Sequence, residues 1–459
     1  MTNPSATGRG VWSSKTGFIL AASGSAIGLG NIWRFPYMVG EGGGAAFVVI
    51  YLGFVFLLGA AVMLAELALG RHTDRNAVGA FAATAPGTLW KLVGMLGVIT
   101  GVAILSFYAV IAGWTVGYLF KTVTGSFSQT VTAQESQAIF ESFASSPTAN
   151  LGLLFAFLAV TSIVVWRGVS GGIERVSKIL MPVLLGLLIL LAIRSVTLSG
   201  AGAGLEFYLA PDFSRISVAT FPAALGQAFF SLSLGMGAMI TYGSYVSKKI
   251  NLVTSTGIIC LFDTLIALLA GLIIFPALFH AGMSPSGGGV GLVFQVLPTL
   301  FAELPAGQLF GAAFFLLLAI AALTSAIALL EVPVSYVIDE WGWSRGKAVA
   351  ATAIVTFLIG VPSALASGAV PFFSDLPGAA PDFLSLMSII FGNYALTIGS
   401  LGLAIFVGYR WGVQAAAAEI ESEGVTFGLK HAWGFLLRFL APVGITAILV
   451  YIIATGNYF

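Results

Sequence analysis

Gly24-Ser-Ala-Ile-Gly-Leu-Gly-Asn-Ile-Trp-Arg-Phe-Pro-Tyr37 interrupts the first long apolar segment of the chain. The segment from Thr16 to Trp33 carries no charge and is long enough to cross a bilayer as a helix, but three glycines lie near its centre. A helix that unwinds there exposes backbone N–H and C=O groups at membrane depth, where protein or a polar ligand must satisfy them. We therefore predict a broken helix whose carbonyls hold a cation and whose amides hold an anion. Glycines that merely allow close helix packing are the alternative.

The composition is that of a membrane protein. Of the 459 residues, 58% are hydrophobic and 8% are charged, whereas soluble domains carry about 25% charged residues. The formal net charge of +1 does not favour nucleic-acid binding, and a single cysteine, Cys260, excludes a disulfide framework. The N-terminus lacks the pattern of a cleaved signal peptide, so we expect the first span to be retained. We expect one transmembrane domain over residues 1–459.

Apolar segments of membrane-spanning length recur along the chain. Fifteen of the 19 Lys and Arg residues fall on the side of the N-terminus, and the outer side keeps only Arg34, Lys121, Arg194 and Arg215. This asymmetry indicates a cytoplasmic N-terminus, and an odd number of spans places the C-terminus outside. We expect short helices in the outer segment 281–307 and a solvated helix or linker over 415–423. The eleven predicted spans are 15–39, 43–70, 91–120, 151–166, 174–198, 219–247, 252–280, 308–339, 347–366, 383–409 and 433–456.

A second interruption lies in the sixth predicted span. Gly226-Gln-Ala-Phe-Phe-Ser-Leu-Ser-Leu-Gly-Met-Gly237 concentrates Gly and Ser within the uncharged run from Ile216 to Ser247. Interrupted helices at corresponding positions of two halves indicate an inverted repeat with a binding site between the repeats. We therefore expect spans 1–5 (15–198) and 6–10 (219–409) to form the two repeats, with span 11 (433–456) peripheral.

Both interruptions also carry a family resemblance. Gly28-Leu-Gly-Asn-Ile-Trp-Arg-Phe-Pro-Tyr37 resembles the signature of the neurotransmitter:sodium symporter family, and the second interruption resembles the sixth helix of that family. The resemblance covers almost the whole chain. It implies the all-α LeuT-type fold, a 5+5 inverted repeat with helices 1 and 6 broken, and sodium-coupled import by alternating access. A twelfth span of larger relatives is missing, which suggests a bacterial member in the inner membrane.

Sodium prefers about five or six hard oxygen ligands, and such oxygens cluster in both interruptions and in Ala321-Ala-Leu-Thr-Ser325 of span 8. Hydroxyls that bond back to their own helix are the alternative for Thr324 and Ser325. By resemblance, two sodium sites are expected. The first site is implied to use Ala26, Asn31, Ser231 and Asp263. The second is implied to use Gly24, Ile27, Ala321, Thr324 and Ser325.

The implied substrate pocket is uncharged, because neither interruption nor Ile104-Leu-Ser-Phe-Tyr108 places a charged side chain in it. Relatives that carry monoamines have Asp where Gly28 stands, and glycine leaves room for the ligand's own carboxylate. We expect the amides of Leu29 and Gly30, the Tyr108 hydroxyl and the first sodium to hold that carboxylate. The full set of expected substrate-binding residues is Ala26, Gly28, Leu29, Gly30, Ile104, Tyr108, Phe230, Ser231, Ser233, Met236, Ser325 and Leu329.

The apolar wall of this pocket indicates the substrate class. Ile104, Phe230, Met236 and Leu329 would line it, and methionine repacks around different shapes. We expect import of neutral aliphatic and aromatic L-amino acids. Transport of GABA, taurine or glycine is one alternative; a non-transporting sensor on the same fold and a channel are others. No nucleophile–base pair or metal motif supports an enzyme.

Asp263 indicates whether chloride or protons take part in transport along with sodium. Many relatives recruit chloride, whereas Asp263 offers a fixed carboxylate at the first sodium site, so we expect transport without chloride. A carboxylate alone in an apolar span is costly to keep ionised once sodium leaves. This raises the hypothesis of proton counter-transport, and a protonated aspartate used only for packing is the alternative.

Charges near the two membrane surfaces are expected to form gates. Arg34 should pair with Asp382 across the outer vestibule. At the inner mouth, Arg9 and Trp12 should meet Asp339 near Tyr245. Passive interfacial salt bridges are the alternative.

Glu66 lies in span 2, and Gly172 and Pro182 lie before and within the start of span 5. We expect Glu66 to satisfy the backbone of the broken helix, and Gly172 with Pro182 to let the start of span 5 unwind and admit water to the second sodium. The role of Glu331 and the oligomeric state stay open.

Overall fold

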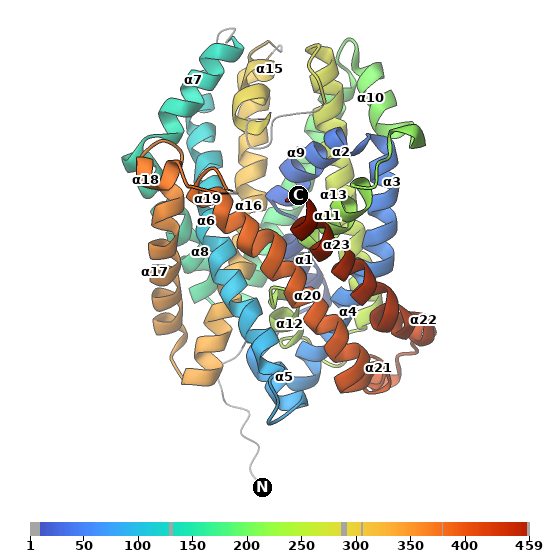
Figure 1. The fold of residues 1–459 in the computed structure, drawn as a ribbon. Helices are drawn as coiled ribbons and strands as arrows, with labels where there is room; N and C mark the ends of the chain where they lie inside the picture. Colours follow the sequence, from blue (N-terminus) through green and yellow to red (C-terminus); the bar gives the residue numbers. More distant parts are fainter. Residues whose placement is uncertain (1–9, 128–131, 286–291, 304–305, 379, 457–459) are drawn as a thin grey trace.

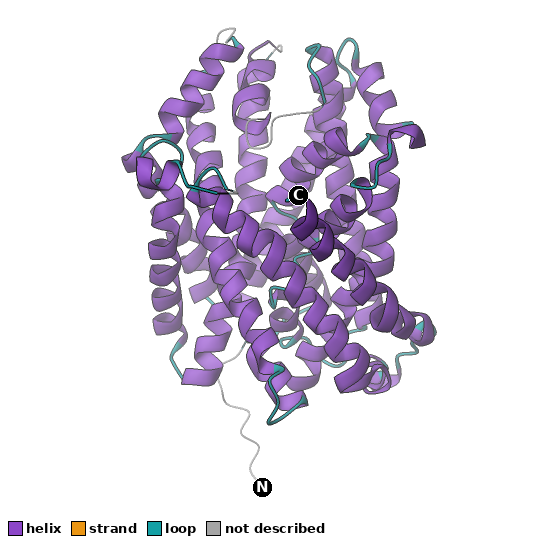
Figure 2. Cartoon of the chain, in the orientation of Figure 1, coloured by secondary structure: helices purple, strands orange, loops and turns teal. Residues whose placement is uncertain are grey.

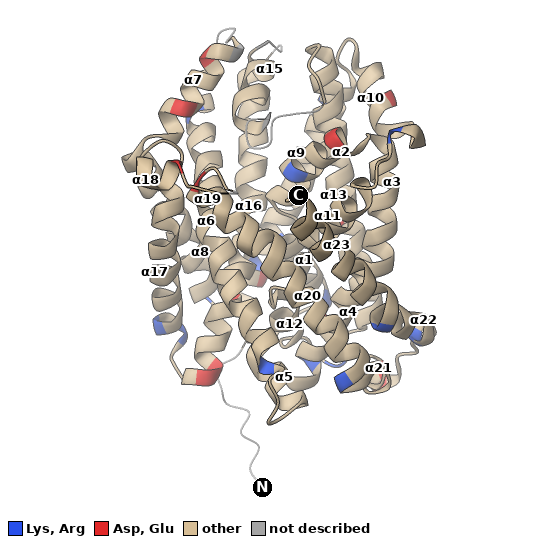
Figure 3. Ribbon diagram, viewed as in Figure 1, with Lys and Arg blue, Asp and Glu red and all other residues tan. Residues whose placement is uncertain are grey.

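The protein is a bundle of helices that stand roughly side by side (Figures 1 and 2). The computed structural model describes residues 10–127, 132–285, 292–303, 306–378 and 380–456, and this part of the chain contains no strand. Figure 3 shows most charged residues toward the two ends of the bundle. We call the end with α5, α12 and α21 the inner end and the end with α7, α10 and α15 the outer end (Figure 1).

Nine helical segments in the described ranges are long and apolar enough to cross a membrane. They agree with predicted spans 2–5 and 7–11 to within a few residues at most ends. Their bounds are Ala45–Thr73, Lys91–Val123, Pro147–Trp166, Val169–Val196, Leu252–His280, Gly307–Trp341, Arg345–Ala364, Phe383–Ile420 and Lys430–Thr455.

Predicted spans 1 and 6 are absent from this set because each is divided into two shorter pieces. Helix α1 (Lys15–Ala26) ends at Ile27, whose backbone is extended, and the chain continues as η1 (Gly30–Arg34) and α2 (Phe35–Gly42). Helix α11 (Thr220–Ser231) is separated from α12 (Ala238–Gly243). Gly235 and Gly237 have φ of +80° and +76° in that gap, a conformation that glycine adopts without strain. Both predicted interruptions are confirmed.

The remaining elements follow the chain in order. The second, third and fourth long segments are α3 (Ala45–Phe54), η2 (Val55–Gly59) and α4 (Ala60–Thr73), then α6 (Lys91–Val123), then α8 (Pro147–Trp166). Segment 169–196 consists of η3 (Val169–Glu174) and α9 (Arg175–Val196), and α13 (Leu252–His280), α16 (Gly307–Trp341) and α17 (Arg345–Ala364) follow. The last two long segments are α19 (Phe383–Met387), η6 (Ser388–Ala395), α20 (Leu396–Ile405), η7 (Phe406–Gly412) and α21 (Val413–Ile420), then α22 (Lys430–Phe435), η9 (Leu436–Leu440) and α23 (Ala441–Thr455).

Short helices connect the long ones at both ends. They are α5 (Ala77–Thr84), α7 (Ala133–Ala144), α10 (Ala201–Leu209), η4 (Phe213–Arg215), η5 (Leu292–Val296), α15 (Leu297–Glu303), α18 (Pro371–Ser374) and η8 (Ser422–Gly424). The helices expected in segment 281–307 are present as η5 and α15, while residues 286–291 lie outside the described ranges.

The centre of the bundle holds the broken helices. Helix α1 contacts α9, α13 and α16, and α6 packs along α16. Apolar side chains such as Phe155, Leu190, Ile354 and Val450 point outward from α8, α9, α17 and α23. Such a surface suits lipid better than water, because half or more of each of these side chains is exposed.

One predicted segment differs from the structure. The tract 415–423 was expected to be a solvated helix or linker, but α21 buries Ala416, Ala417 and Ile420 against the bundle. Glu419 on this helix is only 7% exposed and accepts a hydrogen bond from Arg71 Nε at 2.8 Å. The alanine-rich tract therefore carries a buried ion pair that ties α21 to α4.

Candidate functional site

The carbonyl oxygens freed at the first interruption face span 8. Ser325 Oγ lies 3.1 Å from the Ser25 carbonyl oxygen, 3.2 Å from that of Ile27 and 3.5 Å from that of Gly24. Thr324 Oγ1 lies 3.5 Å from the Ile27 carbonyl, and it also bonds back to the Ala321 carbonyl at 3.0 Å. The five residues expected at the second sodium site thus lie together. The donor set consists of neutral oxygens, which fits a monovalent hard cation.

A second group of oxygens lies between η1, α11 and α13. Asn31 Nδ2 donates to Asp263 Oδ1 at 2.7 Å and to Ser231 Oγ at 3.0 Å, and Ser231 Oγ lies 2.9 Å from both carboxylate oxygens. All three side chains are buried. The Asn31 oxygen accepts from Gly28 N at 3.2 Å. Three of the residues expected at the first sodium site therefore meet, and a cation there would face a carboxylate as well as neutral oxygens.

Tyr51 of α3 also belongs to this group, although it was not among the residues predicted from the sequence. Its hydroxyl lies 3.3 Å from Ser231 Oγ and 3.5 Å from Asp263 Oδ2, and the side chain is fully buried. Tyr51 sits in an apolar span with no pattern to distinguish it from a packing residue, so only its neighbours in space reveal the contact.

A small cavity of about 30 Å³ lies between the two oxygen groups. Tyr108 reaches across it from α6, and its hydroxyl accepts a hydrogen bond from Leu29 N at 3.2 Å. Of the expected substrate-binding set, only Leu29 is absent from the lining, and Ser25 is added. The lining residues are Ser25, Ala26, Gly28, Gly30, Ile104, Tyr108, Phe230, Ser231, Ser233, Met236, Ser325 and Leu329.

Gly28 is required by the closeness of its neighbours. A Cβ added there would lie 2.5 Å from Ser325 Oγ and 2.9 Å from the Tyr108 hydroxyl. Gly30 is similar, since its Cβ would lie 2.9 Å from the Phe230 ring. Any larger residue at position 28 would displace the two hydroxyls that lie beside the cavity.

Two buried polar side chains support the second interruption. Glu66 Oε1 accepts a hydrogen bond from Gly235 N at 2.7 Å, so the expectation that Glu66 satisfies backbone at a broken helix is confirmed for the second break. Gln227 was not predicted; its Nε2 donates to the Gly30 carbonyl at 3.0 Å and so joins the two breaks. Both contacts hold irregular backbone at membrane depth, where water would otherwise be needed.

A larger cavity of about 200 Å³ adjoins the small one on its outer side. The two share Gly30, Tyr108 and Phe230, and the outer cavity extends past Arg34 to Asn393 on η6. The guanidinium carbon of Arg34 lies 4.2 Å from the centre of the Phe230 ring, a cation–π distance. Phe230 thus separates the two cavities, and Arg34 lies above it.

The expected ion pair between Arg34 and Asp382 is not formed. Asp382 caps α19 and its Oδ1 accepts from Ser385 N at 2.7 Å, and no ion pair between described residues joins it to Arg34. The outer cavity lies between span 1 and span 10 in this conformation, which accounts for the separation.

The inner end is closed around Trp12. Its ring nitrogen donates to the Tyr242 carbonyl at 3.0 Å, its backbone N donates to the Tyr245 carbonyl at 3.3 Å, and its ring packs on both tyrosine rings. Asp339 accepts from the backbone and side-chain nitrogens of Asn76 at 2.9 and 3.0 Å. Arg9, the other predicted member of the inner gate, lies outside the described residues.

Two buried carboxylates at the inner end were not assigned from the sequence. Glu331, which is fully buried, forms an ion pair with Arg345 and accepts from the Tyr245 hydroxyl at 2.7 Å. Glu174 accepts from Ser13 N and Ser13 Oγ at 2.7 and 2.6 Å and pairs with Lys178. Both link segments that are far apart in the sequence, so no local motif indicates them.

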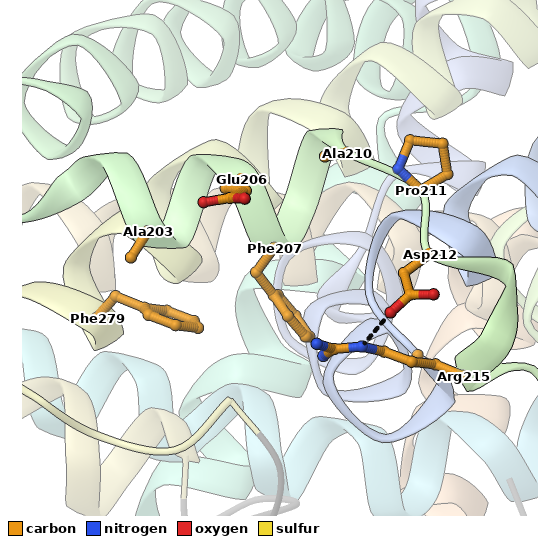
Figure 4. A pocket seen from close by; sticks show the side chains of 9 residues that line it. Ala203, Glu206, Phe207, Ala210, Pro211, Asp212, Arg215 and Phe279 are labelled. Atoms are coloured by element: carbon orange, nitrogen blue, oxygen red, sulfur yellow. Dashed lines mark hydrogen bonds and ion pairs between the residues drawn. The ribbon is translucent and has the colours of Figure 1, made fainter.

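Larger cavities lie elsewhere among the described residues. One of about 500 Å³ lies at the outer end beside α10, where Arg215 pairs with Asp212 at 3.0 Å and Phe207 and Glu206 lie close by (Figure 4). None of the predicted sodium, substrate or gate residues lines it. The candidate site is therefore identified by its oxygen groups and not by its size.

A family model supports the same assignment. The model of the sodium:neurotransmitter symporter family matches residues 9–149 and 133–457. The chain belongs to the sodium:neurotransmitter symporter family. Members of this family are sodium-dependent transporters, so the chain is a multi-pass membrane transporter and not an enzyme.

Related sodium-dependent transporters match over nearly their whole length. An uncharacterized sodium-dependent transporter of Bacillus subtilis, YhdH, is 39% identical over 448 residues, which cover 97% of this chain and 98% of the relative. One from Haemophilus influenzae is 36% identical over 96% of this chain and 98% of the relative. The crystal structure of MhsT in complex with L-phenylalanine superposes with a TM-score of 0.89 at 45% identity, covering 96% of this chain and 99% of that one. The expected LeuT-type fold is thus supported by a close structural neighbour.

Proposed function

We propose that the protein is a sodium-coupled symporter that imports neutral, hydrophobic L-amino acids. The observation that carries the proposal is the small cavity, whose uncharged lining lies between two groups of oxygen atoms. Ile104, Met236 and Leu329 supply an apolar wall, and Tyr108 and the backbone of the first break supply polar contacts. The binding of L-phenylalanine by MhsT favours the same substrate class.

Two sodium ions are proposed as co-substrates. The first would lie among Ala26, Asn31, Ser231 and Asp263, and the amide of Asn31 would turn its oxygen toward the ion. The second would lie among Gly24, Ile27, Ala321, Thr324 and Ser325. Each positive charge that enters down a 100 mV potential supplies about 2.3 kcal/mol, so two ions can drive uphill uptake.

The substrate carboxylate is proposed to lie where a larger residue at position 28 would intrude. The hydroxyl of Tyr108, the amides of Leu29 and Gly30, and the first sodium would bind it. The ammonium group would face the carbonyls of Ala26, Phe230 and Ser231 and the hydroxyl of Ser233. GABA, taurine and glycine carry no apolar side chain to contact Ile104, Met236 and Leu329, which makes these zwitterions the second choice.

Alternating access is proposed to use the two ends of the bundle in turn. The outer cavity leads to Phe230 while Trp12 covers the inner end, as expected of a carrier that faces outward. Closure would then bring Arg34 toward Asp382, and release inward would separate Arg9 and Trp12 from Tyr245 and Asp339.

The membrane arrangement completes the proposal. Each pair of half-helices would cross as one broken span, so that nine unbroken spans and two broken ones give eleven, in two repeats of five and a peripheral helix. The excess of Lys and Arg at the inner end favours a cytoplasmic N-terminus and an outer C-terminus in a bacterial inner membrane.

Chloride independence and proton counter-transport are proposed on the basis of Asp263. Its carboxylate lies beside Asn31 and Ser231 at the first sodium site, where it supplies the negative charge that chloride would supply elsewhere. Once sodium leaves, a proton on Asp263 would reduce the cost of a buried charge.

Uptake by proteoliposomes tests the proposal directly. Purified protein is reconstituted with an inward sodium gradient, and radiolabelled phenylalanine, leucine, GABA, taurine and glycine are supplied in turn. We expect saturable accumulation of phenylalanine and leucine that requires sodium and persists when gluconate replaces chloride. Unchanged accumulation with potassium in place of sodium would refute sodium coupling, and binding without accumulation would identify a sensor.

A further inference from the structure

A further cavity, lined by basic and aromatic side chains, lies at the inner end, away from the proposed transport site. It has a volume of about 480 Å³ and runs between α21 and the helix formed by α22 and η9. Val413 and Ala417 form one wall, and Gly434 lets the other wall approach, because a Cβ there would lie 2.7 Å from Val413 Cγ1. None of the sodium, substrate or gate residues lines this groove.

The groove carries a cationic row. Lys430 of α22 and Arg438 of η9 both line it, about two helical turns apart. Lys430 Nζ lies 3.2 Å from Glu421 Oε1, so part of its charge is compensated. Arg438 donates from Nε to the Gly408 carbonyl at 2.9 Å. Its terminal nitrogens make no hydrogen bond to any other residue that the structure describes, so they can bind an anion in the groove.

An aromatic row runs beside the cations. His431, Phe435 and Phe439 follow one another at four-residue spacing and also line the groove. Phe435 and Phe439 are 54% and 53% exposed. Val443 continues the row by one more turn and is 70% exposed on the side of α23 that faces away from the bundle. The apolar surface therefore leads from the cationic end of the groove along the outside of the protein toward the middle of its apolar belt.

We propose that this groove binds an anionic phospholipid. The phosphate group lies between Lys430, His431 and Arg438, where an imidazole N–H and the free guanidinium nitrogens donate to its oxygens. One acyl chain lies along Phe435 and Phe439.

The two rows together favour a lipid over a soluble phosphate compound. Inorganic phosphate would bind the cations, but it would make no contact with the exposed phenylalanine rings. A lipid uses both, since its headgroup is charged and its chains are apolar. The groove also lies at the end of the bundle that has the excess of Lys and Arg, and basic pockets between spans on that side suit anionic headgroups.

Titration of the purified full-length protein with lipid, followed by native mass spectrometry, tests the inference. The probes are dioleoylphosphatidylglycerol, dioleoylphosphatidylcholine and inorganic phosphate. The double variant Lys430→Gln with Arg438→Gln removes both cations, and Phe439→Ser removes part of the acyl-chain surface but keeps the charges. Lys91→Gln is the matched control, because Lys91 is an exposed cation at the inner end outside the groove.

The expected pattern separates the headgroup from the chain. Each basic residue at a membrane surface is worth a factor of about five, so the double variant should bind phosphatidylglycerol about 25-fold more weakly than the parent. Phe439→Ser should weaken it as well, the Lys91 variant should match the parent, and phosphatidylcholine should bind less tightly than phosphatidylglycerol. Melting temperatures show that each variant is folded.

Two results would overturn the inference. Equal weakening in the double variant and in Lys91→Gln would mean that lipid binds through general surface charge. Displacement of the lipid by excess inorganic phosphate, with no effect of Phe439→Ser, would assign the groove to a soluble anion instead. Neither result depends on transport activity, so this test stands apart from that of the symporter.

Discussion

Replacing Gly28 by alanine should weaken amino-acid binding without unfolding the protein. The added methyl group would lie 2.5 Å from Ser325 Oγ and 2.9 Å from the Tyr108 hydroxyl, both too close for non-bonded atoms. Ser325 cannot move without loss, because its hydroxyl bonds to the carbonyls of Ser25 and Ile27 at 3.1 and 3.2 Å. Tyr108 is likewise held by Leu29 N at 3.2 Å.

The size of the effect follows from the cost of overpacking. Extra methyl groups in a packed interior cost about 1–3 kcal/mol. The free protein can relax by displacing Ser325 or Tyr108. The bound state needs both groups in place, so the free energy of overpacking is subtracted from that of binding. Because about 1.4 kcal/mol corresponds to a tenfold change in affinity, the dissociation constant should rise about 5- to 140-fold. Sodium binding should weaken too, since Ser325 belongs to the second proposed ion site.

Equilibrium binding of radiolabelled L-phenylalanine to the purified protein, repeated over a range of sodium concentrations, measures both effects. Gly53→Ala is the control: Gly53 lies in helix α3, nothing lies within 4 Å of its added Cβ, and alanine is the better helix former. If Gly28→Ala bound phenylalanine as tightly as the Gly53 variant, with the same sodium dependence, the placement of the carboxylate beside Gly28 would be wrong.

Three further changes test separate parts of the site. Tyr108→Phe removes the hydroxyl that is proposed to donate to the substrate carboxylate and should weaken phenylalanine binding by about 1.5–3 kcal/mol; an unchanged binding isotherm would contradict the proposed carboxylate contact. Asp263→Asn should abolish proteoliposome uptake or make it depend on chloride, and chloride-independent uptake at the parent rate would rule out a charge-balancing role. Arg345→Gln leaves the Glu331 carboxylate buried without its partner and should lower the free energy of unfolding by about 3–5 kcal/mol, whereas adding Glu331→Gln should restore much of it; thermal melts in detergent that show equal losses for the single and double variants would argue against a buried ion pair.

The two breaks were predictable because their cause is local. Gly24, Gly28 and Gly30 in one apolar run, and Gly235 and Gly237 in another, disfavour helix wherever they occur. All but one of the residues expected around the substrate line the small cavity, because the family motif fixes which residues flank each break, and their roles in binding stay predictions. These residues were assigned to the pocket from the family resemblance, since periodicity alone would leave Met236 and Leu329 as ordinary packing residues.

The contacts between distant charges were not predictable. Glu331 reaches Arg345 and Tyr245 from another helix, and Glu419 reaches Arg71 across hundreds of residues, so no spacing in the sequence relates them. The alanine-rich tract around Glu419 looked solvated because its charges are dense, yet one of them is paired inside the bundle. The pairing of Arg34 with Asp382 is absent from this structure, where Asp382 caps α19, and it stays a prediction for a conformation in which the outer cavity is closed.

The hydrogen bonds from Ser13 to Glu174 have a consequence for the order in which the protein folds during synthesis. The two residues are 161 positions apart, and at about 5–20 residues per second a ribosome needs roughly 8 to 30 s to reach the second after the first. Tyr242, which accepts from Trp12, is 230 positions away from it and is made later still. Ser13 and Trp12 are therefore synthesised well before their partners, and the inner closure can form only when span 6 has followed.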